Sequence, residues 1–342
     1  MIELSLAWSI VAFLGGAAVI ALAGTMLTRR ADELADRTGL GEAFMGAVFL
    51  GAITSLPGIT ASVTAAVAGD ASLALSNAIG GIAAQTAFLA IADFWHRESN
   101  LEHAAASAQS LIHSTLLIVL LGLLLVAAAG PEMTIGWVHP ASPTLLAVYA
   151  YGTWMAWGSK DRPMWRPQLT EQTQVEADDA DVDSGRSLLR VWGVFGVLAL
   201  VVAASGWFVT HAVQDLSRHT GINSSVAGAA FIAVATSLPE LITSIAAVRQ
   251  GALKLAVGGI IGGNAFDTLF AAVADMAYRD GSLYHAATSR ELVLIGMSVV
   301  MTAVLLMGLV RRQKFGIAGI GFESFTLLLL YGLTMALLAW PQ

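Results

Sequence analysis

The chain has no cysteine and little charge. Among its 342 residues there is no Cys, which excludes a disulfide, a thiolate metal ligand and a catalytic thiol. Only 12% of the residues are charged, whereas a soluble domain carries about 25%. The hydrophobic fraction of 56% and the mean hydropathy of +0.73 indicate that most of the chain lies in lipid.

Long apolar runs account for this composition. A helix that crosses a bilayer needs about 20 apolar residues. Ten runs are candidates: 5–27, 41–68, 72–95, 105–129, 141–158, 189–213, 223–248, 253–277, 291–310 and 318–339. The run 141–158 is the weakest because it is short and amphipathic. We therefore predict an all-α polytopic membrane protein with about ten transmembrane helices.

The distribution of basic residues predicts the orientation. Arg29 and Arg30 follow the first apolar run and only Glu3 precedes it, the reverse of a cleavable signal peptide. If the N-terminus is outside, all but three of the 17 Lys and Arg residues fall on the cytoplasmic side. We predict a multi-pass protein of the bacterial inner (plasma) membrane, with both termini outside.

The two halves of the chain repeat each other. Residues 51–93 align with 233–275 without a gap, and 18 of these 43 positions are identical. Five spans separate the copies, so they face opposite ways, as in the inverted repeats of secondary transporters. We predict an N-terminal five-helix half (1–158, repeat motif about 45–95), a cytoplasmic acidic linker (159–188) and a C-terminal five-helix half (189–342, repeat motif about 227–277).

The linker carries a run of carboxylates in QTQVEADDADVDSG. A solvated linker is the simplest interpretation. A peripheral divalent-cation site is the alternative, but the run lacks the ligand spacing and the turn glycine of a calcium loop.

Each copy contains Thr-Ser-Leu-Pro in the middle of a span, as TSLPG (Thr54–Gly58) and TSLPE (Thr236–Glu240). Pro57 and Pro239 cannot donate a backbone hydrogen bond, so each breaks its helix and frees a carbonyl oxygen in the membrane. A proline kink with hydroxyls bonded to their own helix would explain a single copy. Two inverted copies, one with a mid-membrane carboxylate at Glu240, favour a functional site.

The second helix of each hairpin adds polar groups, in SNAIGGIAAQ (76–85) and GGIIGGNAFD (258–267). Gln85 and Asp267 occupy equivalent positions and are expected to point toward the pseudo-twofold axis, whereas Gly80 and Gly262 fit close helix packing. Hydroxyl, amide and carboxylate oxygens suit hard cations such as Na⁺ and Ca²⁺. Further polar residues receive lesser roles: Asp93 and Asp275 are expected at the membrane interface or in a cation-attracting vestibule, and His113 as a buried hydrogen-bonded histidine or a proton relay.

The paired motifs resemble the repeats of the cation/Ca²⁺ exchanger superfamily, the sodium/calcium exchanger family, which read roughly G-T-S-L-P-E…G-N-x-x-G-S-N-x-x-[ND]. The resemblance implies ten helices, outside termini and alternating coordination of Na⁺ and Ca²⁺. It also implies a set of ligands from both repeats: Thr54, Ser55, Gln85, Thr236, Ser237, Glu240 and Asp267, with Asn77 and Asn264 as secondary candidates.

The chain departs from that pattern at the site itself. Gly58 replaces the first-repeat Glu, and Gly81 and Gly263 replace Ser. Two carboxylates from one repeat remain, enough to balance one Ca²⁺ or two monovalent cations. Gly58 is expected to leave space that water could fill. Because neighbouring buried carboxylates repel each other, one of the two is expected to exchange a proton for a cation.

The sequence thus predicts a secondary antiporter that exchanges Ca²⁺ or a related cation for Na⁺ or H⁺ by alternating access at a midplane site. A monovalent Na⁺ or K⁺/H⁺ exchanger and a transport-inactive cation-binding protein are the alternatives. The predicted partners are small inorganic cations and the lipid bilayer, with no cofactor. No enzyme motif and no basic patch for nucleic acid is present. The oligomeric state stays open.

Overall fold

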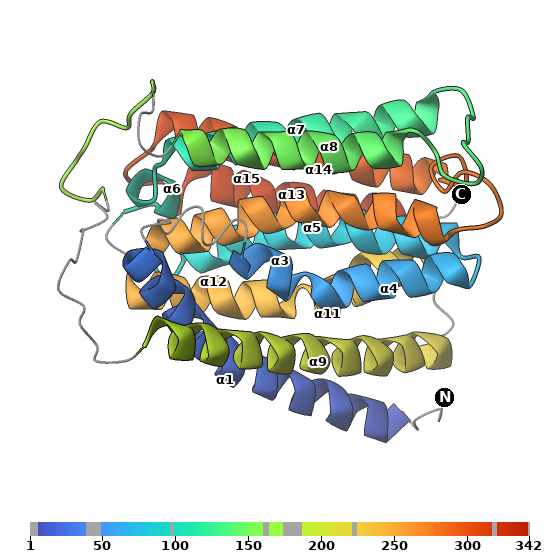
Figure 1. Cartoon of the computed structure of the whole chain (residues 1–342), viewed down its shortest axis with the longest axis horizontal. Helices are drawn as coiled ribbons and strands as arrows, with labels where there is room; N and C mark the ends of the chain where they lie inside the picture. The colour runs from blue at the N-terminus through green and yellow to red at the C-terminus, as the bar shows by residue number, and fades with distance from the viewer. Residues whose placement is uncertain are drawn as a thin grey trace.

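A computed structural model describes residues 6–38, 49–96, 99–159, 164–173, 187–220, 224–316 and 320–340. Across these ranges the secondary structure is helical apart from one isolated bridge between Ile135 and Val138. The long helices run side by side along the length of the molecule (Figure 1). The prediction of an all-α polytopic fold is confirmed.

The helices fall into two series. The first half contains α1 (Leu6–Thr38), α3 (Gly51–Thr54), α4 (Leu56–Val67), α5 (Ala71–Asp93), α6 (Leu101–Ala104), α7 (Ala108–Ala129) and α8 (Ala141–Gly158). The second contains α9 (Leu188–Thr220), α10 (Ser224–Val226), the π-helical turn η2 (Ala227–Ile232), α11 (Ala233–Thr236), α12 (Leu238–Gln250), α13 (Leu253–Ala277), α14 (Ser289–Arg311) and α15 (Phe322–Ala339).

The duplication extends beyond the two hairpins to the other described helices of each half. Helix α9 starts and ends 182 residues after α1, which is also the separation of Gln85 from Asp267. The pairs α3 and α11, α4 and α12, α5 and α13, α7 and α14, and α8 and α15 follow the same offset to within two residues. In Figure 1, α1 and α9 lie side by side and run in opposite directions, as an inverted repeat requires.

Most of the predicted spans appear as helices. Seven helices in the described part of the chain are long and apolar enough to cross a membrane, and η2 and α11 together with α12 give an eighth if this pair, bent by 44°, is counted as one span. Helix α8 coincides with the predicted run 141–158, and α3 and α4 with part of the run 41–68, of which residues 41–48 lie outside the described ranges. Helices α1 and α9 are longer than predicted. Each has 33 residues, about 50 Å of helix, and exceeds a hydrocarbon core of about 30 Å.

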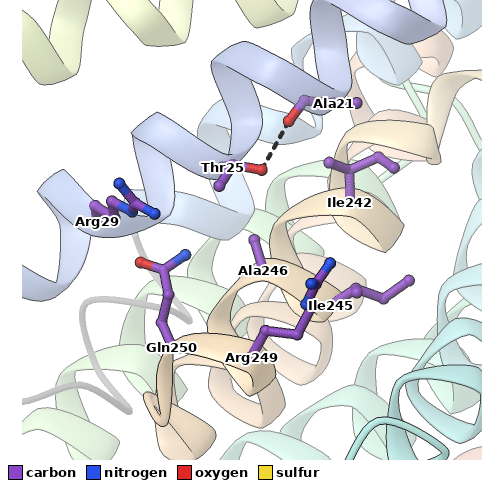
Figure 2. Close-up of a pocket in the computed structure, with 8 residues that line it drawn as sticks. All are labelled: Ala21, Thr25, Arg29, Ile242, Ile245, Ala246, Arg249 and Gln250. Atoms are coloured by element: carbon purple, nitrogen blue, oxygen red, sulfur yellow. Dashed lines mark hydrogen bonds between the residues drawn. The ribbon is translucent and has the colours of Figure 1, made fainter.

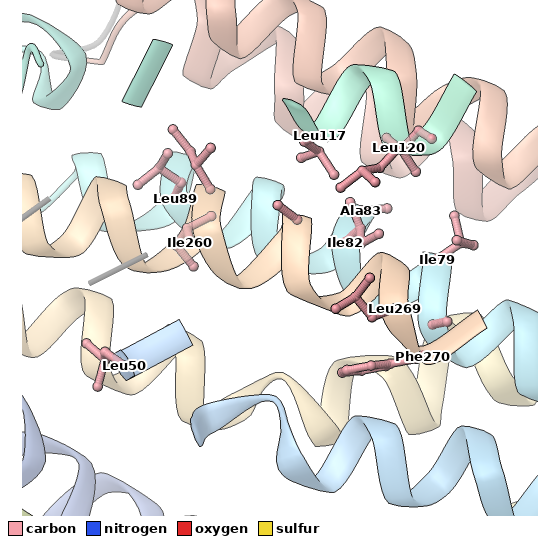
Figure 3. Close-up of a cluster of buried hydrophobic side chains, with 14 of the residues drawn as sticks. Leu50, Ile79, Ile82, Ala83, Leu89, Leu117, Leu120, Ile260, Leu269 and Phe270 are labelled. Carbon is pink, nitrogen blue, oxygen red and sulfur yellow. The ribbon is translucent and has the colours of Figure 1, made fainter. Parts of the chain in front are cut away.

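Helices α5 and α13 form the centre of the bundle. In their apolar stretches 94% and 89% of the residues are buried, against 22% in α1 and in α9. Their side chains pack with those of α7, including Ile79, Ile82, Leu117, Leu120 and Leu269 (Figure 3). Small residues let other helices approach this centre closely. A Cβ at Gly51 would lie 2.7 Å from the backbone nitrogen of Gly263, and one at Gly80 would lie 2.6 Å from Ala229 Cα.

The two halves are interleaved by reciprocal contacts of Asp93 and Asp275. Asp93, at the end of α5, accepts hydrogen bonds from its own loop and from the start of α15, at Leu101 N (2.7 Å), Gly321 N (3.2 Å) and Ser324 Oγ (2.9 Å). Asp275, at the end of α13, accepts the equivalent bonds from Leu283 N (3.1 Å), His139 N (2.8 Å) and Ser142 Oγ (2.6 Å) of α8. Each carboxylate therefore fastens the last helix of the opposite half.

Candidate cation site

Both Thr-Ser-Leu-Pro motifs interrupt a helix near the middle of the bundle. Helix α3 ends at Thr54 and α4 begins at Leu56, so Pro57 lies in a first turn, where its missing N–H removes no helical hydrogen bond. Helix α11 ends at Thr236 and α12 begins at Leu238, which gives Pro239 the same place. The breaks bring the turns at Ser55 and Ser237 against the central helices α5 and α13.

Two fully buried carboxylates lie at these turns. The Ser55 hydroxyl donates to Glu240 Oε1 across a long 3.4 Å contact. Gln85 Nε2 donates to Asp267 Oδ2 at 2.6 Å and to Ser237 Oγ at 3.2 Å. The repeat mates Gln85 and Asp267 therefore meet directly, in the geometry expected of residues that face a pseudo-twofold axis.

The unpaired atoms of this cluster are all oxygens. Glu240 Oε2, Asp267 Oδ1 and Gln85 Oε1 are buried and have no hydrogen-bond partner. Among the described residues, no Lys or Arg forms an ion pair with either carboxylate. Buried negative charge with free acceptor oxygens from both repeats is suited to a bound hard cation.

The hydroxyl oxygens of Thr54 and Thr236 are available to accept from a donor or to bind a cation, because their protons are already donated elsewhere. The Thr54 hydroxyl donates to the carbonyls of Leu50 (2.9 Å) and Gly51 (3.1 Å), and that of Thr236 to the carbonyl of Ala233 (3.1 Å). A hydroxyl that donates to its own helix keeps oxygen lone pairs for another partner.

Phe270 occupies the space beside Gly58. A Cβ at Gly58 would lie only 2.5 Å from Cε2 of the Phe270 ring. The prediction that Gly58 leaves space for water is therefore wrong, because an aromatic side chain of α13 fills the position. The missing first-repeat carboxylate is replaced by an apolar wall.

The glycines that replace the family serines face the cluster. A Cβ at Gly81 would lie 3.5 Å from Ser237 Oγ and 3.6 Å from Asp267 Oδ2, and one at Gly263 would lie 3.5 Å from Gln85 Oε1. These are ordinary contact distances, so a small side chain at either position would fit and would point at the site.

The two asparagines have structural bonds and one free oxygen each. Asn77 Nδ2 donates to the Gly58 carbonyl (2.9 Å) and to Ser62 Oγ (2.8 Å), and so ties α5 to α4 just after the break. Asn264 Nδ2 donates to Thr86 Oγ1 (2.9 Å). The Oδ1 atoms of both are buried without a partner.

Other predicted polar residues lie away from the cluster. Asp93 and Asp275 lie near the ends of α5 and α13, are completely buried and accept hydrogen bonds from backbone, so neither lines an open vestibule; their depth at the membrane interface stays a prediction. His113 is buried, and its Nδ1 contacts the Gln109 carbonyl at 3.0 Å, as expected of a hydrogen-bonded histidine. The acidic run of the linker lies outside the described residues.

Sequence reasoning did not find Phe270, Ser62 or Thr86, all of which shape the cluster. All three carried one signal, since each is identical to its repeat mate (Phe88, Ser244 and Thr268). The two hydroxyls pair with asparagines 15 and 178 residues away, and no local pattern marks such partners.

Comparison with known proteins identifies the family. The chain matches the family described as sodium/calcium exchanger protein over residues 8–158 and 189–340, which are nearly all of both halves. The chain belongs to the sodium/calcium exchanger family. This exchanger family is one of membrane transporters, so the predictions of the family and of a transporter rather than an enzyme are confirmed.

Relatives of this exchanger cover most of its length. It is 28% identical over 287 residues to the antiporter candidate CaxA of Alkalimonas amylolytica, across 84% of each chain. It is 25% identical over 279 residues to the inner membrane protein YrbG of Escherichia coli, across 81% of this chain and 82% of that one. A structure of the sodium-calcium exchanger NCX_Mj soaked with Na⁺ and Sr²⁺ shares its fold, with a TM-score of 0.69 at 18% identity over 97% of this chain and 99% of that one.

Proposed function

We propose that this exchanger is a secondary antiporter that moves Ca²⁺ or a related small cation against Na⁺ or H⁺ through the cluster around Glu240 and Asp267. The observation that carries the proposal is the pair of buried carboxylates without a basic partner in the described chain. Such charges are costly in a membrane unless a cation or a proton neutralises them. The names of its relatives, an antiporter candidate and sodium/calcium exchangers, agree with a cation as substrate.

The composition of the cluster supports exchange. The charge of the two carboxylates can be balanced by one divalent ion, by two monovalent ions or by protons, and the neutral oxygens can complete the coordination of a metal ion. The cluster has too little charge to hold two of these alternatives at once. Occupancy by one of them therefore excludes the others. Competition for one site is the chemical basis of antiport.

The peripheral helix pair α1 and α9 supplies the moving part of the proposed cycle. A Cβ at Gly206 of α9 would lie 2.4 Å from Pro57 Cγ, directly at the first break. Its repeat mate Gly24 of α1 instead faces Ile242 and Thr243, about one turn beyond Pro239. The positions of α1 and α9 along the helices that they pack against are therefore not related by the pseudo-twofold symmetry. In our proposal, α1 and α9 slide until Gly24 packs at Pro239 and Gly206 packs one turn beyond Pro57, and this movement opens the site to the opposite side of the membrane.

A monovalent Na⁺ or K⁺/H⁺ exchanger is the second candidate, and Phe270 is the observation that favours it. The ring occupies the position from which a first-repeat carboxylate would reach a divalent ion. The cluster then has a charge of −2 at most, and a single proton on either carboxylate leaves a site suited to one monovalent ion.

Flux in proteoliposomes tests the proposal. Gradients of Na⁺, K⁺, Ca²⁺ and H⁺ are imposed one at a time, and the counter-flow of each other ion is recorded. We expect coupled counter-flow in the wild type and none in Glu240→Gln, since removal of one charge leaves the site unable to neutralise a divalent ion or to exchange a proton.

Glu132→Gln is the matched control because Glu132 is exposed on a loop. It should transport like the wild type. Coupling of Ca²⁺ to Na⁺ or H⁺ identifies the first candidate, and coupling of Na⁺ or K⁺ to H⁺ without Ca²⁺ identifies the second. Ion flux that ignores every imposed counter-gradient, or normal exchange by Glu240→Gln, would rule out antiport at this site.

A further inference from the structure

A groove of about 470 Å³ separates α1 from α12 at the end of the bundle where their basic residues lie. Along the same stretch, helices α1 and α12 are also in contact: the Thr28 hydroxyl contacts the Thr243 carbonyl at 3.3 Å, and a Cβ at Gly24 would lie 3.4 Å from Ile242. The groove lies outside the cation cluster and is lined by Ala21, Thr25, Arg29, Ile242, Ile245, Ala246, Arg249 and Gln250.

The lining of the groove is divided by polarity. Figure 2 shows Arg29 and Gln250 near one end of the groove, the Arg249 guanidinium beside Ile245, and Ala21 and Ile242 toward the other end. The Thr25 hydroxyl in between donates to the Ala21 carbonyl at 2.8 Å, so it offers no free proton. A molecule that fits this lining has an acceptor-rich, negatively charged head and an apolar body.

The polar end has donors and no acceptor partner for them. Arg30 is paired with Glu33, but neither Arg29 nor Arg249 has an ion-pair partner among the described residues. Gln250 Nε2 is buried and has no hydrogen-bond partner. A buried amide donor without an acceptor is unfavourable, and it lies in the same groove as two unpaired guanidinium groups. Phosphate oxygens would satisfy all three side chains, and guanidinium groups bind phosphate with two parallel hydrogen bonds.

The depth of the groove matches that of a lipid. The apolar part of α1 ends just before Arg29, after which the helix continues as the polar segment RRADELADRT (29–38). Helix α12 ends at Gln250. Both boundaries mark the membrane–water interface on the side with the excess of Lys and Arg, where headgroups of anionic lipids lie.

We propose that this groove binds an anionic phospholipid, with the phosphate at Arg29, Arg249 and Gln250 and an acyl chain along Ala21, Ile242 and Ala246. The lipid would bridge the peripheral helix α1 to α12, the helix whose first turn contains Glu240. The site is independent of the proposed antiport, because lipid binding is measured without any cation gradient.

Native mass spectrometry of the purified full-length chain with dioleoylphosphatidylglycerol tests the proposal. An arginine at an anionic headgroup contributes roughly fivefold to binding. We therefore expect Arg29→Gln/Arg249→Gln to raise the dissociation constant about 25-fold. Gln250→Leu, which keeps the size of the side chain and removes the donor, should raise it about fivefold. Arg29 and Arg249 are exposed, and Arg249 and Gln250 lie in the last turn of α12, so these variants are expected to fold.

The control removes two charges elsewhere. Arg166→Gln/Arg190→Gln alters two exposed arginines outside the groove and should change the dissociation constant less than about twofold. Equal loss in the control and groove variants would overturn the proposal, as would equal affinity for the zwitterionic dioleoylphosphatidylcholine. Displacement of the lipid by glycerol 3-phosphate at equal concentration would also overturn it, since a soluble phosphate ester would then be the ligand.

Discussion

Residue 58 illustrates how one substitution is accommodated by another side chain. Gly58 lacks the carboxylate of the family pattern, and the Phe270 ring fills its place. The two positions lie on α4 and α13, so a glutamate at 58 requires a smaller residue at 270.

We therefore predict that Gly58→Glu alone destabilises the protein by about 1–3 kcal/mol, because even its Cβ would overlap the ring at 2.5 Å. Gly58→Glu/Phe270→Ala removes the overlap and adds a third carboxylate, so it should bind Ca²⁺ more tightly than the wild type. Isothermal titration calorimetry gives the affinity, and thermal unfolding gives the stability. Phe270→Ala alone is the control. A fully stable Gly58→Glu variant with raised Ca²⁺ affinity would show that the ring does not hold this position.

Glu102 of α6 is a second residue whose surroundings determine its charge. It is completely buried between spans, and burial raises the pKa of its carboxyl well above its ordinary value of 4.5. The carboxyls of Asp93 and Glu323 raise this pKa further. Between the ordinary pKa of 4.5 and the raised pKa, the folded protein therefore holds a proton that the unfolded chain has released. The free energy of unfolding falls as pH rises from the first of these values to the second.

Glu102→Gln should remove this pH dependence. We expect the variant to match the wild type near pH 4.5 and to become more stable than it as pH rises above that value, by about 1.4 kcal/mol for each unit by which the pKa is raised. Melting temperatures in detergent across this range measure the difference. Glu132→Gln, at an exposed position, should follow the wild type. A wild type that stabilises with rising pH relative to Glu102→Gln would contradict the assignment.

At the scale of elements, the ends of α5 and α13 determine how the outer helices attach. Asp93 and Asp275 each accept three hydrogen bonds, two of them from the opposite half. Asn at either position keeps the shape but loses a charged acceptor. Since a hydrogen bond to a charged group contributes about 1.5–3 kcal/mol, each substitution should lower stability by about 2 kcal/mol or more.

Thermal unfolding of Asp93→Asn and Asp275→Asn measures this loss. The two variants should be affected about equally, because their partners are repeat mates. Asp280→Asn, at an exposed position of the loop after α13, is the control and should be neutral. A large loss in one variant and none in the other would contradict the reciprocal attachment.

Local sequence patterns were sufficient for the elements but not for their partners. Apolar runs, the prolines 57 and 239 and the repeated motif predicted where the helices lie and where two of them break. The lengths of α1 and α9 could not be predicted, because hydropathy marks where a helix leaves lipid and not where it ends. The role of Asp93 depends on Gly321 and Ser324, more than 200 residues away, and position along a helix says nothing of such contacts.

At the scale of the whole molecule, the offset of 182 residues made much of the site predictable. Pseudo-symmetry placed Gln85 opposite Asp267 before any contact was known. The same symmetry could not predict where the halves differ, such as the ring at Gly58 or the groove between α1 and α12. Those features come from side-chain volume and from unequal packing of mates such as Gly24 and Gly206.

The reciprocal attachment of Asp93 and Asp275 also bears on biosynthesis. A ribosome delivers α8 to the membrane long before Asp275, and α5 long before Ser324. After the first half has been inserted, Ser142 therefore lacks its bond to Asp275 until α13 follows, and Asp93 lacks its bond to Ser324 until α15 follows. Because each half supplies bonds that the other lacks, the native contacts of both are complete only after α15, the last helix, has been inserted.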